Sequence, residues 1–138
     1  MEIIEAQLPL LRHIVDFGLV VLIWLVQLII YPSFRYLDRA QLEFWHKRYV
    51  ARITSVVGPL MVAQALVVSM QLYAEMHWLH AFSLVLVGLC WICSFGLSIP
   101  CHRKIERGQG TAEVLEHLVR TSWPRTILWT AVFVLGFM

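Results

Sequence analysis

Glutamate and histidine side chains recur at helical spacing in the polar stretches of this 138-residue chain. Glu43 and His46 are three residues apart, and Glu106 follows His102 by four. Residues at these spacings share one helix face, and a carboxylate beside an imidazole can hold a metal ion in a helical bundle. Glu43, His46 and His102 are therefore candidate ligands for a transition metal. The alternative is that they are solvated residues at the level of the lipid headgroups.

His46, His102 and Tyr49 are also candidate catalytic residues, because imidazole and phenol groups can exchange protons with a substrate. Arg52, Arg120 and Arg125 lie at the starts of apolar runs, where a guanidinium can bind a carboxylate, a phosphate or a developing oxyanion. Arg52 is the foremost of the three, since it lies two turns before Pro59. The predicted substrate-binding residues are Arg52, Arg120 and Trp123. Snorkelling of these arginines toward lipid phosphates is the competing interpretation.

A second polar group lies near the opposite ends of the apolar runs. His13 and Asp16 are three residues apart, and His77 and His80 precede the third run. A haem between His13 and His80 is conceivable but less expected than a transition metal. Gln64 and Gln71 are seven residues apart, and we expect them to mark an inward helix face and to form hydrogen bonds between helices.

The elements that position these residues are apolar helices. Hydrophobic residues make up 59% of the chain and charged residues only 14%, whereas soluble domains carry about 25% charged residues. Four runs approach the roughly 20 residues that a helix needs to cross a bilayer, and they cover residues 14–31, 53–73, 79–99 and 123–138. Pro32 and Pro100 are expected to end the first and third. The sequence predicts an all-α, polytopic integral membrane protein, with residues 1–138 forming a single antiparallel, up-down four-helix bundle.

The connections between the runs are predicted to be ordered. The segment 37–52 lacks glycine and proline, so we expect the second helix to run unbroken from near Ala40 to Tyr73, with a bend near Pro59. The segment Thr111–Val119 has one apolar face and is predicted to form a separate interfacial helix. The connection near residues 75–78 is so short that the second and third helices must be neighbours.

The basic residues predict the orientation in the membrane. Ten of the 11 Lys and Arg residues fall in the segments 35–52 and 101–125, and only Arg12 lies on the other side. Short loops with such a bias stay in the cytoplasm. We therefore expect a multi-pass protein of the bacterial inner membrane with its N-terminus and C-terminus outside.

Several short motifs accompany this layout. The first run ends in Tyr-Pro, a His-x-x-Tyr-x-x-Arg motif precedes the second, Pro-x-His follows the third, and Arg-Thr-x-Trp precedes the fourth. The residues concerned are Trp24, Gln27, Tyr31, Pro32, His46, Tyr49, Arg52, Pro59, Pro100, His102, Arg120, Thr121 and Trp123. In this respect the chain resembles small bacterial four-span proteins and is loosely similar to the anthrone-oxygenase-like family. The resemblance implies a compact four-helix bundle and, in some members, oxygenation of a lipophilic aromatic molecule without an obvious organic cofactor.

Three functions are consistent with these patterns. The first is a membrane-embedded oxidoreductase or oxygenase-like enzyme that acts on a lipophilic small molecule. Its pocket would lie at the cytoplasmic end of the bundle, lined by His46, Tyr49, Arg52, His102 and Arg120 and capped by the 111–119 helix. The second is a non-enzymatic subunit that binds anionic lipid or a partner protein, and the third is a small transporter. The expected partners are the lipid bilayer, a lipophilic molecule and a further copy of the chain, but no nucleic acid.

Overall fold

The computed structural model describes residues 2–138, with side chains from residue 6 onward, and this part of the chain is helical without a strand. The element order is α1 (Glu2–Leu25), η1 (Val26–Ile30), α2 (Tyr31–Ser33), η2 (Phe34–Tyr36), α3 (Arg39–Ala74), α4 (Trp78–Cys93), η3 (Ser94–Ser98), α5 (Ile99–Glu106) and α6 (Ala112–Leu135). The predicted all-α class is confirmed.

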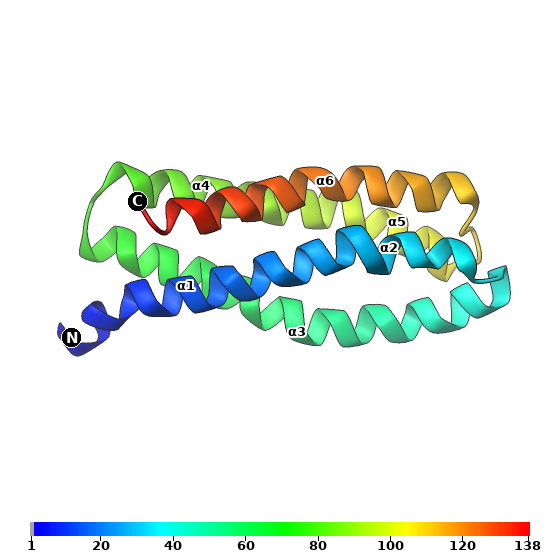
Figure 1. Cartoon of the computed structure of the whole chain (residues 1–138), viewed down its shortest axis with the longest axis horizontal. Coiled ribbons are helices and arrows are strands. Elements are labelled where there is room, and N and C mark those ends of the chain that lie inside the picture. The colour runs from blue at the N-terminus through cyan, green and yellow to red at the C-terminus, as the bar shows by residue number, and fades with distance from the viewer. Residues whose placement is uncertain (1) are drawn as a thin grey trace.

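The long helices lie side by side along the longest axis of the molecule (Figure 1). α1 packs between α3 and α6, and α4 packs between the same two helices. The two termini and the α3–α4 connection lie at one end, while the α2–α3 and α5–α6 connections lie at the other (Figure 1). We call these the terminal end and the loop end.

The helix α3 is continuous over 36 residues, as the sequence predicted. Asp38 begins it with a capping box, in which its side chain accepts a hydrogen bond from the Gln41 backbone at 2.8 Å. The Gln41 side chain accepts in return from the Asp38 backbone at 3.2 Å. The predicted short connection to α4 is also confirmed, since α3 ends at Ala74 and α4 starts at Trp78.

The Asp38 cap should contribute measurably to stability. Replacing Asp38 with alanine removes the acceptor for a helix N-terminal N–H, and we expect a loss of about 1 kcal/mol in the free energy of unfolding. Unfolding in detergent micelles, followed by circular dichroism, measures the loss. Ser55→Ala is the control, because Ser55 is exposed within the same helix and bonds only a local carbonyl. Equal stability of the two variants would contradict the capping role.

The prediction that Pro32 and Pro100 end their helices is wrong. A π-helical segment directly precedes each of the dipeptides Tyr31-Pro32 and Ile99-Pro100. The Tyr31 N–H bonds the carbonyl of Val26, and the Ile99 N–H bonds that of Ser94, so both bonds span five residues. A proline inside an α-helix clashes with the carbonyl four residues earlier. The wider turn relieves this crowding, and the helices continue to Tyr36 and Glu106.

The separate interfacial helix at Thr111–Val119 is also not observed. Thr111 does cap a helix, as predicted, but that helix is α6 and it runs through Pro124 to Leu135. Leu115 and Leu118 are buried in the protein core. The apolar face of this segment therefore packs against protein, which removes the reason to lie flat on a membrane.

Three helical stretches are long and apolar enough to cross a membrane: Ala6–Tyr36, Arg39–Ala74 and Trp78–Glu106. α6 is not among them. Large apolar side chains are nevertheless exposed on all four sides of the helical assembly. They include Leu10, Ile14, Phe17, Leu28, Ile29, Val56, Leu66, Tyr73, Phe82, Val85, Ile92, Phe95, Ile127, Val134 and Phe137. Exposed apolar surface of this extent is what a helix presents to lipid.

A polar network occupies the interior near the terminal end. Arg12 and Asp16 are 3% and 1% exposed and form an ion pair at 3.3 Å. Arg12 also donates to Gln71 at 3.1 Å and to Ser83 at 2.7 Å. Gln64 donates to Asp16 at 2.6 Å and accepts from the Trp129 indole at 3.0 Å. The network thus joins α1, α3, α4 and α6, and it confirms that Gln64 and Gln71 face inward.

Candidate functional site

The main cavity of the described residues has a volume of about 380 Å³ and is lined mostly by apolar side chains. Its walls come from α1, η1, α2, α3, η3, α5 and α6. They include Leu22, Ile23, Val26, Ile53, Val57, Met61, Phe95, Ile99 and Trp129. Sites for small molecules have this size and character, with a few polar groups that orient the ligand.

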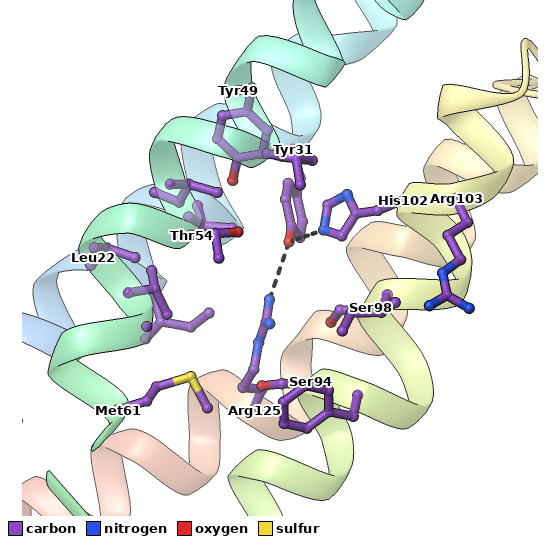
Figure 2. Close-up of a pocket in the computed structure, with 18 of the residues that line it drawn as sticks. Leu22, Tyr31, Tyr49, Thr54, Met61, Ser94, Ser98, His102, Arg103 and Arg125 are labelled. Atoms are coloured by element: carbon purple, nitrogen blue, oxygen red, sulfur yellow. Dashed lines mark hydrogen bonds between the residues drawn. The ribbon is translucent and has the colours of Figure 1, made fainter. Parts of the chain in front are cut away.

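Three polar residues of the cavity wall form a continuous chain of hydrogen bonds with the buried His46. The Arg125 Nη2 donates to the Tyr31 hydroxyl at 3.2 Å. The Tyr31 hydroxyl lies 3.1 Å from His102 Nε2, and His102 Nδ1 lies 2.8 Å from His46 Nε2. Figure 2 shows Arg125 and His102 both reaching the Tyr31 hydroxyl from opposite sides. We call these four residues the relay.

The direction of each hydrogen bond in the relay follows from the chemistry of Arg125, its first member. A guanidinium can only donate, so the Tyr31 oxygen accepts from Arg125. The hydroxyl proton of Tyr31 then has His102 Nε2 as its acceptor. A neutral imidazole carries one proton, so His102 Nδ1 donates to His46 Nε2. Every bond then points from the cavity toward His46.

The π-helical segments position two members of the relay. Tyr31 directly follows η1, and His102 lies one turn after η3. Residues of both segments also line the cavity, among them Val26, Ser94 and Ser98. π-helical turns occur frequently at functional sites because the extra residue redirects the side chains that follow. Here they turn Tyr31 and His102 toward one another.

His46 is the last residue of the relay, on the side nearer the loop end of the molecule. It is 0% exposed and packs against Phe34 and Tyr49, with ring centroids 5.5 and 6.1 Å away. Its Nδ1 has no hydrogen-bond partner among the described residues. Tyr49 lines the cavity beside Tyr31 (Figure 2). The three residues predicted to be catalytic, His46, Tyr49 and His102, are therefore brought together.

Arg125 is a buried cation without a carboxylate partner. It is 9% exposed, and within residues 6–138 no Asp or Glu oxygen lies within 4 Å of it. Its Nη2 bonds Tyr31 and Ser122, whereas its Nε has no partner in the same range. The guanidinium also lies over the Trp129 ring, 5.7 Å from the centroid. A buried charge without a counter-ion is costly, so this cation has the features of an anion-binding group.

The residues predicted to bind substrate are not in the cavity. Arg52 is exposed on α3. Arg120 is exposed and pairs with Glu116 at 3.2 Å. Trp123 packs against Trp24 with ring centroids 5.9 Å apart. The segment 111–119 contributes no lining residue, so it does not cap the cavity.

The predicted metal ligands do not assemble either. Glu43 pairs with Lys47 at 3.3 Å and belongs neither to the relay nor to the cavity wall. In the part of the chain that the structure describes, no three His, Cys, Asp or Glu side chains lie close enough to hold a metal ion. At the terminal end, Asp16 pairs with Arg12, whereas His13 contacts the Pro9 carbonyl and His80 lies 4.0 Å from Glu75. The three cysteines are free.

Tyr31 and Arg125 are the functional residues that sequence reasoning missed. Sequence reasoning placed Tyr31 only in the Tyr-Pro motif at the end of the first apolar run. Arg125 was grouped with two other arginines, of which Arg52 seemed the stronger candidate. The spacing of Ser122, Arg125, Thr126 and Trp129 gave a usable signal, because these polar and aromatic residues recur every three to four positions and share one helix face.

These features define an all-helical protein with membrane-span-like helices around an apolar cavity that holds a hydrogen-bonded relay and a buried cation. Comparison with protein-family models, with curated proteins and with solved structures returned no match to the chain.

Proposed function

We propose that this protein is a four-span, up-down helical bundle of the bacterial inner membrane, with both termini outside. α6 would be the fourth span despite its lower apolarity, because Arg125 and Thr126 turn inward while Ile127 and Val134 face outward. Arg35, Arg39, Arg103 and Arg107 lie near the loop end, which would be cytoplasmic.

The orientation predicts which positions a membrane-impermeant thiol reagent can reach. With the three native cysteines replaced by alanine, a single cysteine at Arg107 should be labelled only after the membrane is opened. A single cysteine at Met76, in the exposed α3–α4 connection, should be labelled in intact cells. The reverse pattern would overturn the orientation.

Within this bundle we infer an enzyme that performs a proton transfer on a lipophilic substrate bound in the cavity. The observation that carries the inference is the relay. Tyr31, His102 and His46 can each donate and accept a proton, and the fourth member, Arg125, is a buried cation at the cavity wall. A subunit that only binds a partner protein or lipid does not need buried proton-transferring residues that meet inside the bundle. The convergence of His46 and His102 therefore favours the enzyme over the subunit.

The relay suggests how the proton would move. Tyr31 passes its hydroxyl proton to His102 Nε2, and the Nδ1 proton of His102 passes to His46 Nε2. The Tyr31 phenolate that results is stabilised by Arg125. It accepts a proton from the substrate, this proton exchanges with solvent, and Tyr31 then returns a proton to the substrate. The proton held on His46 finally passes back through His102 to Tyr31. No proton is gained or lost in the complete cycle.

Deuterium incorporation tests this function without knowledge of the substrate. The purified protein would be incubated in heavy water with a lipid extract of the membranes in which it was produced, and the extract would be analysed by mass spectrometry. We expect at least one lipophilic species to gain carbon-bound deuterium faster with the protein than without it. A complete absence of protein-dependent incorporation would contradict the proposal and favour the docking subunit.

A further inference from the structure

The charge, walls and opening of the cavity restrict what can occupy it. We propose that the occupant is a long-chain lipophilic carboxylate, such as a fatty acid, which enters sideways from the bilayer and binds Arg125 through its carboxylate. This inference names the substrate class for the site of the proposed function, and it concerns binding, which can be measured separately from proton transfer.

The charge of the cavity favours a monoanionic ligand. Arg125 supplies the buried positive charge, and its unpartnered Nε leaves guanidinium donor capacity unused. Arg103 and Glu106 lie on the cavity wall farther out and offset one another in charge. The cavity therefore carries a net charge of about one positive unit, which matches a monoanion. A planar carboxylate suits the fork of a guanidinium.

The shape of the cavity opening indicates where a ligand can enter. The exposed members of the wall, Thr54 on α3 and Phe95 and Arg103 on η3 and α5, lie on the two sides of one gap. Figure 2 shows the cavity between these two helical segments, with Arg125 and Tyr31 at its inner side. Phe95, which lies at the gap, is an exposed apolar residue. The opening thus faces surroundings suited to lipid.

A bound long-chain carboxylate would lie partly in the protein and partly in the bilayer. The apolar wall beside Arg125 can hold the methylenes next to a carboxylate, so that they stay out of water after they leave the bilayer. The rest of an unbranched chain can pass through the gap and remain in lipid. A phospholipid is a poorer match, because a bulky polar headgroup would have to enter an apolar cavity.

Gly58 offers a way to block the cavity without disturbing the fold. It lies on the cavity wall, and a Cβ at this position would meet no atom within 4 Å. Leucine in a helix interior is also favoured over glycine. Gly58→Leu should therefore fold and fill the opening. Gly88→Leu is its matched control, because Gly88 has the same free space but does not line the cavity.

The test is direct binding of palmitate to the purified full-length protein in detergent or nanodiscs, measured by native mass spectrometry. Palmitate should bind wild type and Gly88→Leu alike, and Gly58→Leu should lose binding. Arg125→Gln should weaken binding about 10- to 100-fold, the value expected for lost hydrogen bonds to a charged group. Arg120→Gln, on the same helix but exposed, should have no effect.

Two comparison ligands make the outcome decisive. Methyl palmitate lacks the negative charge and should bind at least about tenfold more weakly than palmitate. A phosphatidic acid presents a phosphate instead of a carboxylate and should not displace palmitate. Equal binding of palmitate by wild type and Gly58→Leu, or preference for the ester or the phosphatidic acid, would overturn the inference. Palmitate binding without any deuterium incorporation would uphold this inference while contradicting the proposed proton transfer.

Discussion

Asp16→Asn should destabilise the folded protein by about 3–5 kcal/mol, because it leaves the buried Arg12 guanidinium without a counter-charge. The shape of the side chain hardly changes, so the effect isolates the charge. In Asp16→Asn the remaining amide oxygen still accepts from the Gln64 amide, but an NH2 group replaces the oxygen that accepts from Arg12 Nε. Unfolding by a denaturing detergent, followed by tryptophan fluorescence, measures the loss.

The matched control is Glu43→Gln, which breaks an ion pair of the same helical spacing. The Glu43–Lys47 pair has the same separation of 3.3 Å, but its side chains are 43% and 57% exposed. Exposed pairs at this spacing contribute roughly 0.3–0.5 kcal/mol. Similar stability of Asp16→Asn and Glu43→Gln would show that Arg12 is compensated by other groups. The double variant Arg12→Met and Asp16→Leu should recover much of the loss, since it leaves no buried charge.

His102→Gln should lower protein-dependent deuterium incorporation by about 10²- to 10⁴-fold, the usual contribution of a positioned acid or base. Glutamine can keep hydrogen bonds to Tyr31 and His46 but cannot pass a proton between them. Tyr31→Phe should have an effect of similar size, because it removes the group that meets the substrate. The rate of incorporation in the heavy-water assay is the measured quantity.

His117→Gln is the control for this prediction. His117 lies exposed on α6 and outside the cavity, so incorporation should stay at the wild-type rate. Palmitate binding should persist in His102→Gln, because Arg125 is unchanged. Retention of full incorporation in His102→Gln would remove the relay from the mechanism even if the protein were still active.

Much of the fold could be predicted from periodicity and composition. The continuous α3 and its short connection to α4 follow from a run of helix formers without an early glycine or proline. The inward faces of Gln64 and Gln71 follow from their seven-residue spacing. The helix ends were less predictable. Proline usually terminates a helix, and nothing in the local sequence predicts the π-helical turn that accommodates it.

The candidate site could be predicted only in part. His46 and His102 are separated by 56 residues, and their meeting follows from placing both near the same end of the molecule. Which arginine turns inward is a different question, because it depends on helix rotation and on where the neighbouring helices pack. Arg52 and Arg125 both lie near predicted span starts. Only Arg125 shares a helix face with Trp129, a buried side chain of the core.

The two π turns have a consequence for how such a site can change. Each turn contains one residue more than α-helical geometry would need over the same path. Winding the same residues of η1 as a regular α-helix, without the wider turn, would rotate Tyr31 relative to α1 by about 100°. The phenol would leave the relay, while the lipid-facing surface of α1 would stay as it is. Cavity chemistry can therefore be altered by a change of one turn between π-helical and α-helical geometry, without the many coordinated substitutions that repacking the helices would require.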